Sequence, residues 1–164
     1  MEIKIPEKNS VLWFDTIDFA EKCSWRAGKE LARLMREDCF NDLESVFTVV
    51  HDNNIIGFCT LTEKDELPPE YPFTPFIGFV FVDENYRGRR VSEKLIKQVI
   101  IYAKNAGFDN VYIMSSETGF YEKYGFEKIG DYDTIYGEIE QLFVISTNRK
   151  ENTSDSGDLI DENN

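Results

Sequence analysis

Histidine is almost absent from this sequence, and cysteine and proline are scarce. Among 164 residues there are one histidine, three cysteines and five prolines. His51 is the only histidine and has no second histidine to form a metal site with, so we expect no metal. Cys23, Cys39 and Cys59 are odd in number and lack metal-like spacing. This pattern indicates reduced thiols in a cytoplasmic protein.

Long apolar runs and an excess of basic residues are also missing. No apolar run reaches the length of a membrane span, and residues 1–6 have no signal-peptide core, so we expect a cytoplasmic protein without a membrane partner. Lys and Arg number 18 against 31 Asp and Glu, a formal net charge of −13. This charge disfavours nucleic acid as a partner, because nucleic-acid-binding proteins present broad basic faces. It suits a cationic substrate, although a generally acidic cytosolic protein is the commoner explanation.

What is present is enough for a packed core. Apolar residues make up 41% of the sequence and aromatic residues 14%, which argues against disorder. A chain of this length is expected to form one domain, which we place at residues 1–147. Residues 148–164 are polar and acidic at their end, so we predict a disordered tail there.

The stretch from residue 75 to residue 107 carries the strongest local pattern. Residues 75–83 are apolar on both faces and rich in β-forming residues, which is typical of a strand in the middle of a sheet. From Val91 to Ala106 the apolar residues recur at helical spacing, which predicts a helix with one face on that sheet. Gly107 follows where a left-handed residue closes a helix.

Between this strand and this helix, a turn carries Arg87, Gly88, Arg89 and Arg90. The first N–H groups of a helix lack internal partners, so a phosphate oxygen can accept from several of them at once. Gly88 lets the backbone approach closely, and three guanidinium groups add positive charge. The turn therefore predicts an anion site; the alternative is a basic turn that only balances the helix end.

The turn also resembles a known motif. Residues 86–92 (YRGRRVS) are similar to the pyrophosphate loop of GNAT superfamily N-acetyltransferases, usually Arg/Gln-x-x-Gly-x-Gly/Ala. Arg90 replaces the first glycine of that motif, and Ser92 stands at its second small position. Downstream, residues 119–126 (GFYEKYGF) resemble the Leu/Phe-Tyr-x-x-x-Gly-Phe motif of the same family. The resemblance covers roughly residues 45–145.

The resemblance implies a mixed α/β (α+β) fold, with a central mixed, mostly antiparallel sheet of about six to seven strands and helices on both faces. The local patterns agree with this architecture. We expect an edge strand at 2–5, two helices within 11–38 with Ser24 as the second N-cap, strands at 46–51, 55–62, 110–115, 126–129 and 137–147, and a short helix at 118–124.

The family resemblance further implies acetyl-CoA as the cosubstrate. In the family the central strand bulges, which would place Val80 nearer the acetyl carbonyl and Val82 nearer the pantetheine arm. Free backbone N–H groups there can stabilise charge on a thioester oxygen. The cosubstrate-binding residues implied are Val80, Phe81, Val82, Arg87, Gly88, Arg89, Arg90, Val91 and Ser92.

Tyr121 is the predicted proton donor. A phenol with a pKa of about 10 keeps its proton at neutral pH and can give it to the departing thiolate. The resemblance selects Tyr121 over Tyr124, and the alternative is that both are core aromatics. The base that deprotonates the amine stays open, because Glu66 and Glu30 are both conceivable.

Acceptor contacts are expected from two regions. In the family the early helical region commonly forms one wall of the acceptor cleft, which implies Trp25 and Arg26; core packing is the alternative for Trp25. The loop at 63–74 is proline-rich and acidic, and loops of this kind often cover sites. Its acidic residues can attract an amine, and the alternative is a solvated loop; these residues are Glu63, Asp65, Glu66 and Glu70.

We therefore predict an N-acetyltransferase that moves an acetyl group from acetyl-CoA to a primary amine of a small cationic molecule, protein or peptide. The reaction is direct attack, with Tyr121 as general acid. The alternative is a non-catalytic acyl-CoA-binding sensor or interaction module, which the Arg90 departure keeps open. A nucleotide-phosphate enzyme ranks lower, because Gly-Lys-Ser/Thr and Gly-x-Gly-x-x-Gly are both missing. A homodimer is possible through the final strand.

Overall fold

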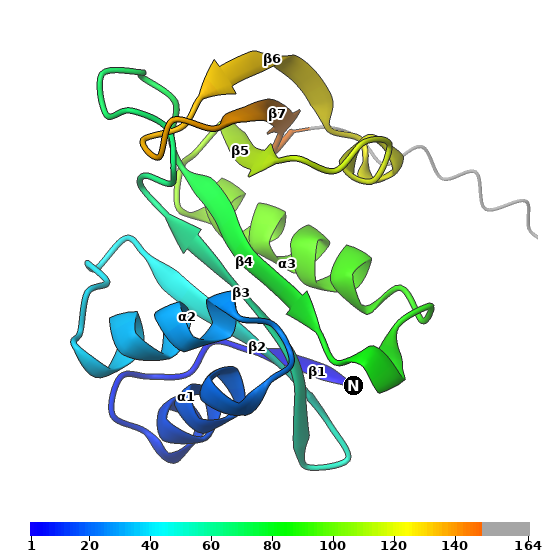
Figure 1. The fold of residues 1–164 in the computed structure, drawn as a ribbon. Helices are drawn as coiled ribbons and strands as arrows, with labels where there is room; N and C mark the ends of the chain where they lie inside the picture. Colours follow the sequence, from blue (N-terminus) through cyan, green and yellow to red (C-terminus); the bar gives the residue numbers. More distant parts are fainter. Residues whose placement is uncertain (149–164) are drawn as a thin grey trace, which may run out of the picture.

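A seven-stranded sheet forms the body of the protein (Figure 1). The computed structural model describes residues 1–148. The strand order is β1-β2-β3-β4-β5-β7-β6, and only β4 and β5 run parallel. The predicted mixed, mostly antiparallel sheet is confirmed, with β4 at its centre. The strands are β1 (Glu2–Lys4), β2 (Ser45–His51), β3 (Asn54–Thr62), β4 (Phe76–Val82), β5 (Asn110–Ser115), β6 (Glu127–Asp133) and β7 (Ile139–Ser146).

Helices cover both faces of this sheet, as predicted. Figure 1 shows α1 (Val11–Lys22) and α2 (Ala27–Arg36) on one face and α3 (Val91–Asn105) on the other. Trp13 and Leu31 belong to the core that packs on the first face, and Leu95 belongs to the core on the second. Two short 3-10 helices, Glu84–Tyr86 and Tyr121–Tyr124, complete the helical elements of the described residues.

The end of α3 confirms the predicted glycine cap. Gly107 has a φ of 95°, a conformation that costs little without a Cβ. Its N–H donates to the Lys104 carbonyl, and the Phe108 N–H donates to the Ala103 carbonyl, both at 3.0 Å. This Schellman pattern satisfies carbonyls that the helix leaves free.

The start of α2 differs from the prediction. The cap position is Arg26, without a side-chain cap bond, and the helix begins at Ala27, so Ser24 is not the N-cap. The neighbouring Trp25 ring stacks on Phe81 with a centroid distance of 6.0 Å. This tertiary packing fixes the turn between the helices, where local cap preference alone favours Ser24.

Two short elements near the end of the chain also have different boundaries. The helix predicted at 118–124 is a 3-10 helix over Tyr121–Tyr124 only. The strand predicted at 126–129 extends to Asp133, because its pairing with β7 continues as far as Ile139. The sequence did not predict this extension because its residues are mostly polar, and an edge strand needs few apolar residues.

β4 departs from regular pairing on both of its edges. Its parallel register with β5 contains one pair, Phe76 and Tyr112, and the two strands then diverge (Figure 1). On the other edge, β3 advances two residues between the pairs Thr60–Gly78 and Phe58–Phe81, while β4 advances three. β4 therefore contains a bulge, and a bulge leaves one residue outside the ladder.

Within residues 1–148, no helix combines the length and apolar character needed to cross a bilayer. The tail predicted at residues 148–164 lies, except for Asn148, outside the described residues.

Candidate active site

A cavity of about 1090 Å³ lies where β4 and β5 diverge. Its walls come from β4 (residues 77–82), β5 (residues 113–115), the turn before α3 and the acidic loop before β4. The separation of the two central strands thus gathers segments that are distant in the sequence around one space.

The N-terminus of α3 opens into this cavity. Arg87, Gly88, Arg90, Val91 and Ser92 all line it. The N–H groups of a helix's first turn have no intrahelical acceptor, so this end can bind an anion. Gly88 has a φ of 79°, and no atom lies within 4 Å of its Cβ position. The backbone is therefore open to a phosphate group, and the residues fit the diphosphate of coenzyme A.

The three arginines of the turn have different surroundings. Arg87 donates from Nε to the Val82 carbonyl at 3.2 Å and lies over the Phe81 ring. The Arg90 side chain is 82% exposed, with Nε 3.9 Å from a Glu93 carboxylate oxygen. Arg89 lies over the Tyr86 ring, 5.3 Å from its centroid, and does not line the cavity. Two of the three predicted guanidinium groups therefore flank the cavity.

Val80, Phe81 and Val82 line the cavity from β4, next to the bulge. Phe79, also in the wall, has a φ of 49°, a left-handed conformation uncommon for a bulky residue. The bulge turns part of the β4 backbone out of regular pairing with β3. The role of Val80 and Val82 as backbone donors stays a prediction.

Tyr121 lines the same cavity and is 8% exposed. Burial, with a smaller contribution from the Glu117 charge, raises the pKa of Tyr121 above the ordinary phenol value. The group therefore holds its proton throughout the neutral range. Tyr124 also lines the cavity, and its hydroxyl lies 3.0 Å from Ser92 Oγ.

Three of the carboxyl groups in the cavity wall come from segments distant in sequence from α3. They belong to Asp65 and Glu66 of the acidic loop and to Glu140 of β7. Burial and the Glu66 charge raise the pKa of Asp65 to about 7. Burial and the neighbouring Glu66 carboxyl also raise the pKa of Glu140. A carboxyl that titrates near neutral pH is suited to accept a proton from a substrate.

Sequence reasoning gave Asp65 no role beyond that of one acidic residue in a loop. A charged run does not indicate which side chain points inward, and that direction comes from tertiary contacts. The Ile135 N–H, in the β6–β7 turn, donates to the Glu66 carbonyl at 2.7 Å. This bond fixes the loop against the sheet, with Asp65 and Glu66 in the cavity wall.

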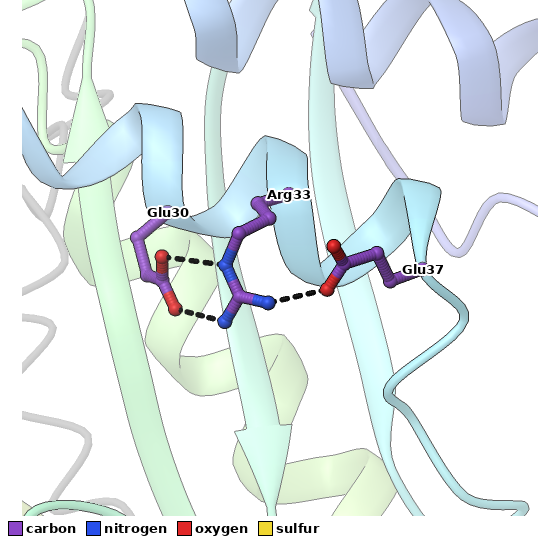
Figure 2. Close-up of polar contacts among 3 residues, drawn as sticks. All are labelled: Glu30, Arg33 and Glu37. Carbon is purple, nitrogen blue, oxygen red and sulfur yellow. Dashed lines mark hydrogen bonds and ion pairs between the residues drawn. The ribbon is translucent and has the colours of Figure 1, made fainter.

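Glu30 does not serve as the base. Figure 2 shows Glu30 and Glu37 on either side of Arg33, along α2. Arg33 donates to Glu30 from Nε at 3.0 Å and from Nη2 at 2.6 Å, and it also bonds Glu37. These bonds lower the pKa of Glu30 below its ordinary value, and Glu30 does not line the cavity. The hypothesis of Glu30 as base is therefore wrong, because an arginine already holds this carboxylate on the outer surface.

The two predicted acceptor contacts from the early helices differ. Trp25 lines the cavity and also stacks on Phe81 and Phe58, so it is both a packed aromatic and a wall. Arg26 is exposed and does not line the cavity. Sequence spacing placed the two together, but their side chains lie in different surroundings.

Comparisons with known proteins agree with this geometry. A sequence profile described as the acetyltransferase (GNAT) family matches residues 12–126. An aminoglycoside 6'-N-acetyltransferase complexed with coenzyme A has 16% identity and a TM-score of 0.69, over 92% of this chain and 99% of its own. The enzyme of that name from Enterococcus faecium has 16% identity and a TM-score of 0.70, with the same coverage of 92% and 99%.

A GNAT family acetyltransferase from Elizabethkingia anophelis, with acetyl-CoA bound, has 19% identity and a TM-score of 0.62, over 88% of this chain and 97% of its own. At these identities the likeness is one of fold. No curated protein matches the sequence significantly.

Proposed function

Because the chain belongs to the GNAT acetyltransferase family, we propose that it transfers an acetyl group from acetyl-CoA to a primary amine of a small cationic molecule or peptide. One observation carries most of this proposal. The α3 N-terminus, the bulged segment of β4, Tyr121 and Asp65 all line a single cavity. These groups match the requirements of acetyl transfer from a thioester to an amine.

The start of α3 binds the diphosphate in this proposal. The N–H groups of the first turn, from Val91 onward, donate to phosphate oxygens, and the positive end of the helix dipole adds to the attraction. Arg87 and Arg90 supply positive charge at the same place. Arg90 stands where the family motif has glycine, and its left-handed φ of 58° lets the backbone follow the path that glycine would take.

In this proposal, the amine attacks the thioester beside the bulge of β4. The Val80 N–H stabilises negative charge on the thioester oxygen as the amine nitrogen attacks the carbonyl carbon. A C–N bond forms and the C–S bond breaks. Tyr121 gives its phenolic proton to the departing sulfur. The proton that the amine nitrogen loses as the amide forms goes to solvent, and solvent reprotonates Tyr121. Its raised pKa ensures that this proton is present at neutral pH.

Asp65 takes the role of base. An amine arrives mostly as an ammonium ion and must lose a proton before it can attack. Asp65, with a pKa of about 7, accepts that proton and returns it to solvent. Glu66, the other residue considered for this role, lies beside Asp65 and contributes the charge that raises its pKa.

Thiol release measured with a thiol-reactive dye tests this function. The protein is incubated with acetyl-CoA and a panel of primary amines, and calorimetry measures coenzyme A binding in parallel. Thiol release that depends on an amine, with a matching acetylated product by mass spectrometry, supports the transferase. Coenzyme A binding without turnover across the panel overturns it in favour of an acyl-CoA-binding module.

A further inference from the structure

Gly78 of β4 lines the cavity next to the acidic loop. Gly78 has no side chain, and the point where its Cβ would stand lies 3.6 Å from Asp65 Oδ2 and 3.2 Å from Thr60 Oγ1. Both oxygens therefore lie next to Gly78, which lines the cavity together with Asp65. Val80, the proposed donor to the thioester oxygen, lies two residues further along β4.

Thr60 is an independent sign that something polar belongs here. The residue is 0% exposed, and its Oγ1 has no hydrogen-bond partner among the described residues. A buried hydroxyl without a hydrogen-bond partner destabilises the folded state, and native proteins rarely contain one. A donor entering the space above Gly78 would satisfy it.

The carboxyl groups around this space also lack partners of opposite charge. Among residues 1–148, no Lys or Arg forms an ion pair with Asp65, Glu66 or Glu140. Neighbouring carboxylates repel one another in a partly buried wall. One ammonium group compensates one of these charges and leaves the others in the wall.

We propose that the acceptor is an organic dication, with one ammonium group above Gly78 and a second cationic group against Glu66 and Glu140. This inference rests on the proposed function and names its substrate class. Within the described residues, no three acidic, His or Cys side chains are arranged to hold a metal ion. The carboxyl groups nevertheless line one cavity, and three carboxylates can compensate more than one ammonium group.

The aromatic wall supports the same occupant. Trp25 and Phe79 line the cavity with a ring-centroid distance of 6.1 Å. Aromatic faces attract ammonium groups and pack against methylene groups. The cavity thus offers carboxylates for the ends of a diamine and apolar surface for its middle.

The test compares 1,4-diaminobutane with 1-aminobutane, which has the same carbon chain and one charge less. Calorimetry measures the binding of each amine to the coenzyme A-saturated protein, and thiol release measures kcat/KM for each. We expect the diamine to be favoured by at least about tenfold in both measurements, a difference typical of one compensated charge in a partly desolvated site.

Glu140→Gln should reduce this preference to about threefold or less. Glu66→Gln is the second variant, should Glu140→Gln fail to fold. The matched control is Glu127→Gln, which removes one exposed carboxylate outside the cavity and should keep the full preference.

Equal binding and equal kcat/KM for the two amines would overturn the inference, as would a preference that survives in both cavity variants. Either result leaves acetyl transfer to an amine intact. A binding preference for the diamine without turnover would instead support the dication site and overturn the proposed transferase.

Discussion

Ser92 Oγ and Tyr124 Oη lie 3.0 Å apart, and this contact links the first turn of α3 to the 3-10 helix that carries Tyr121. One end of the contact stands at the proposed diphosphate site, and the other stands beside the proposed acid. Tyr124 is therefore occupied in a structural bond, while Tyr121 has the role of proton donor.

Replacing each tyrosine by phenylalanine should separate these roles. Tyr121→Phe removes the proposed acid and should lower kcat about 100-fold, the lower range for general acid catalysis, with little change in the KM for acetyl-CoA. Tyr124→Phe breaks only the bond to Ser92 and should keep kcat within about threefold while raising that KM. Steady-state kinetics measure both. Equal losses of kcat in the two variants would contradict the assignment.

The pH dependence should report Asp65. A base must be ionised to act, so kcat/KM should rise with pH until it levels above the Asp65 pKa of about 7. The groups facing Asp65 are Glu66, Glu140 and Tyr121. In Asp65→Asn the rise near pH 7 should disappear together with most of the activity. An unchanged pH profile in this variant would assign the titration to another group.

The same shift has a consequence for stability. The pKa of Asp65 is raised above its ordinary 3.8 in the folded state, so the folded protein binds more protons between about pH 4 and pH 7. Stability from this group is therefore lost as pH rises through that window. Asp65→Asn should have a higher Tm than the wild type at pH 8 and the same Tm at pH 4. Glu70→Gln, at an exposed position of the same loop, should show no such difference.

The sequence was sufficient to predict those structural elements whose pattern lies within a few neighbouring residues. The apolar run of β4, the apolar stripe of α3 and Gly107 each identify their element, because burial on two faces, helical spacing and a left-handed cap are all visible within a few residues. The start of α2, predicted at Ser24, and the role of Asp65 could not be predicted in this way. Tertiary contacts decide where this helix starts and in which direction a loop carboxylate points. Glu30 was equally ambiguous, because its partner Arg33 is recognisable only once the outer face of α2 is known.

Arg90 offers a test of backbone strain at the anion site. Its φ of 58° costs a residue with a Cβ about 1 kcal/mol relative to glycine, and its exposed contact with Glu93 contributes little. Arg90→Gly should therefore be about 1 kcal/mol more stable than Arg90→Ala in urea unfolding. Both variants lose the guanidinium and should show a similarly raised KM for acetyl-CoA. Equal stability would show that this backbone relaxes without cost.

Replacing Gly28 by alanine should destabilise the protein, although this substitution usually stabilises a helix. Replacing glycine by alanine inside a helix normally stabilises by about 0.5–1 kcal/mol, yet here the new Cβ would stand 2.4 Å from the Ala20 carbonyl oxygen and 2.6 Å from Cys23 Sγ. Separating α1 from α2 to make room costs about 1–3 kcal/mol, so Gly28→Ala should unfold at lower urea concentration.

Lys29→Ala, at the next and exposed position of α2, provides the control and should change stability by less than about 0.5 kcal/mol. Because Trp25 lies between the two helices and lines the cavity, a displaced α2 moves this aromatic wall as well. Gly28→Ala should thus raise the KM for the amine while leaving that for acetyl-CoA, whose proposed site is at α3, nearly constant. A stabilised Gly28→Ala protein would show that the contact between the helices yields easily.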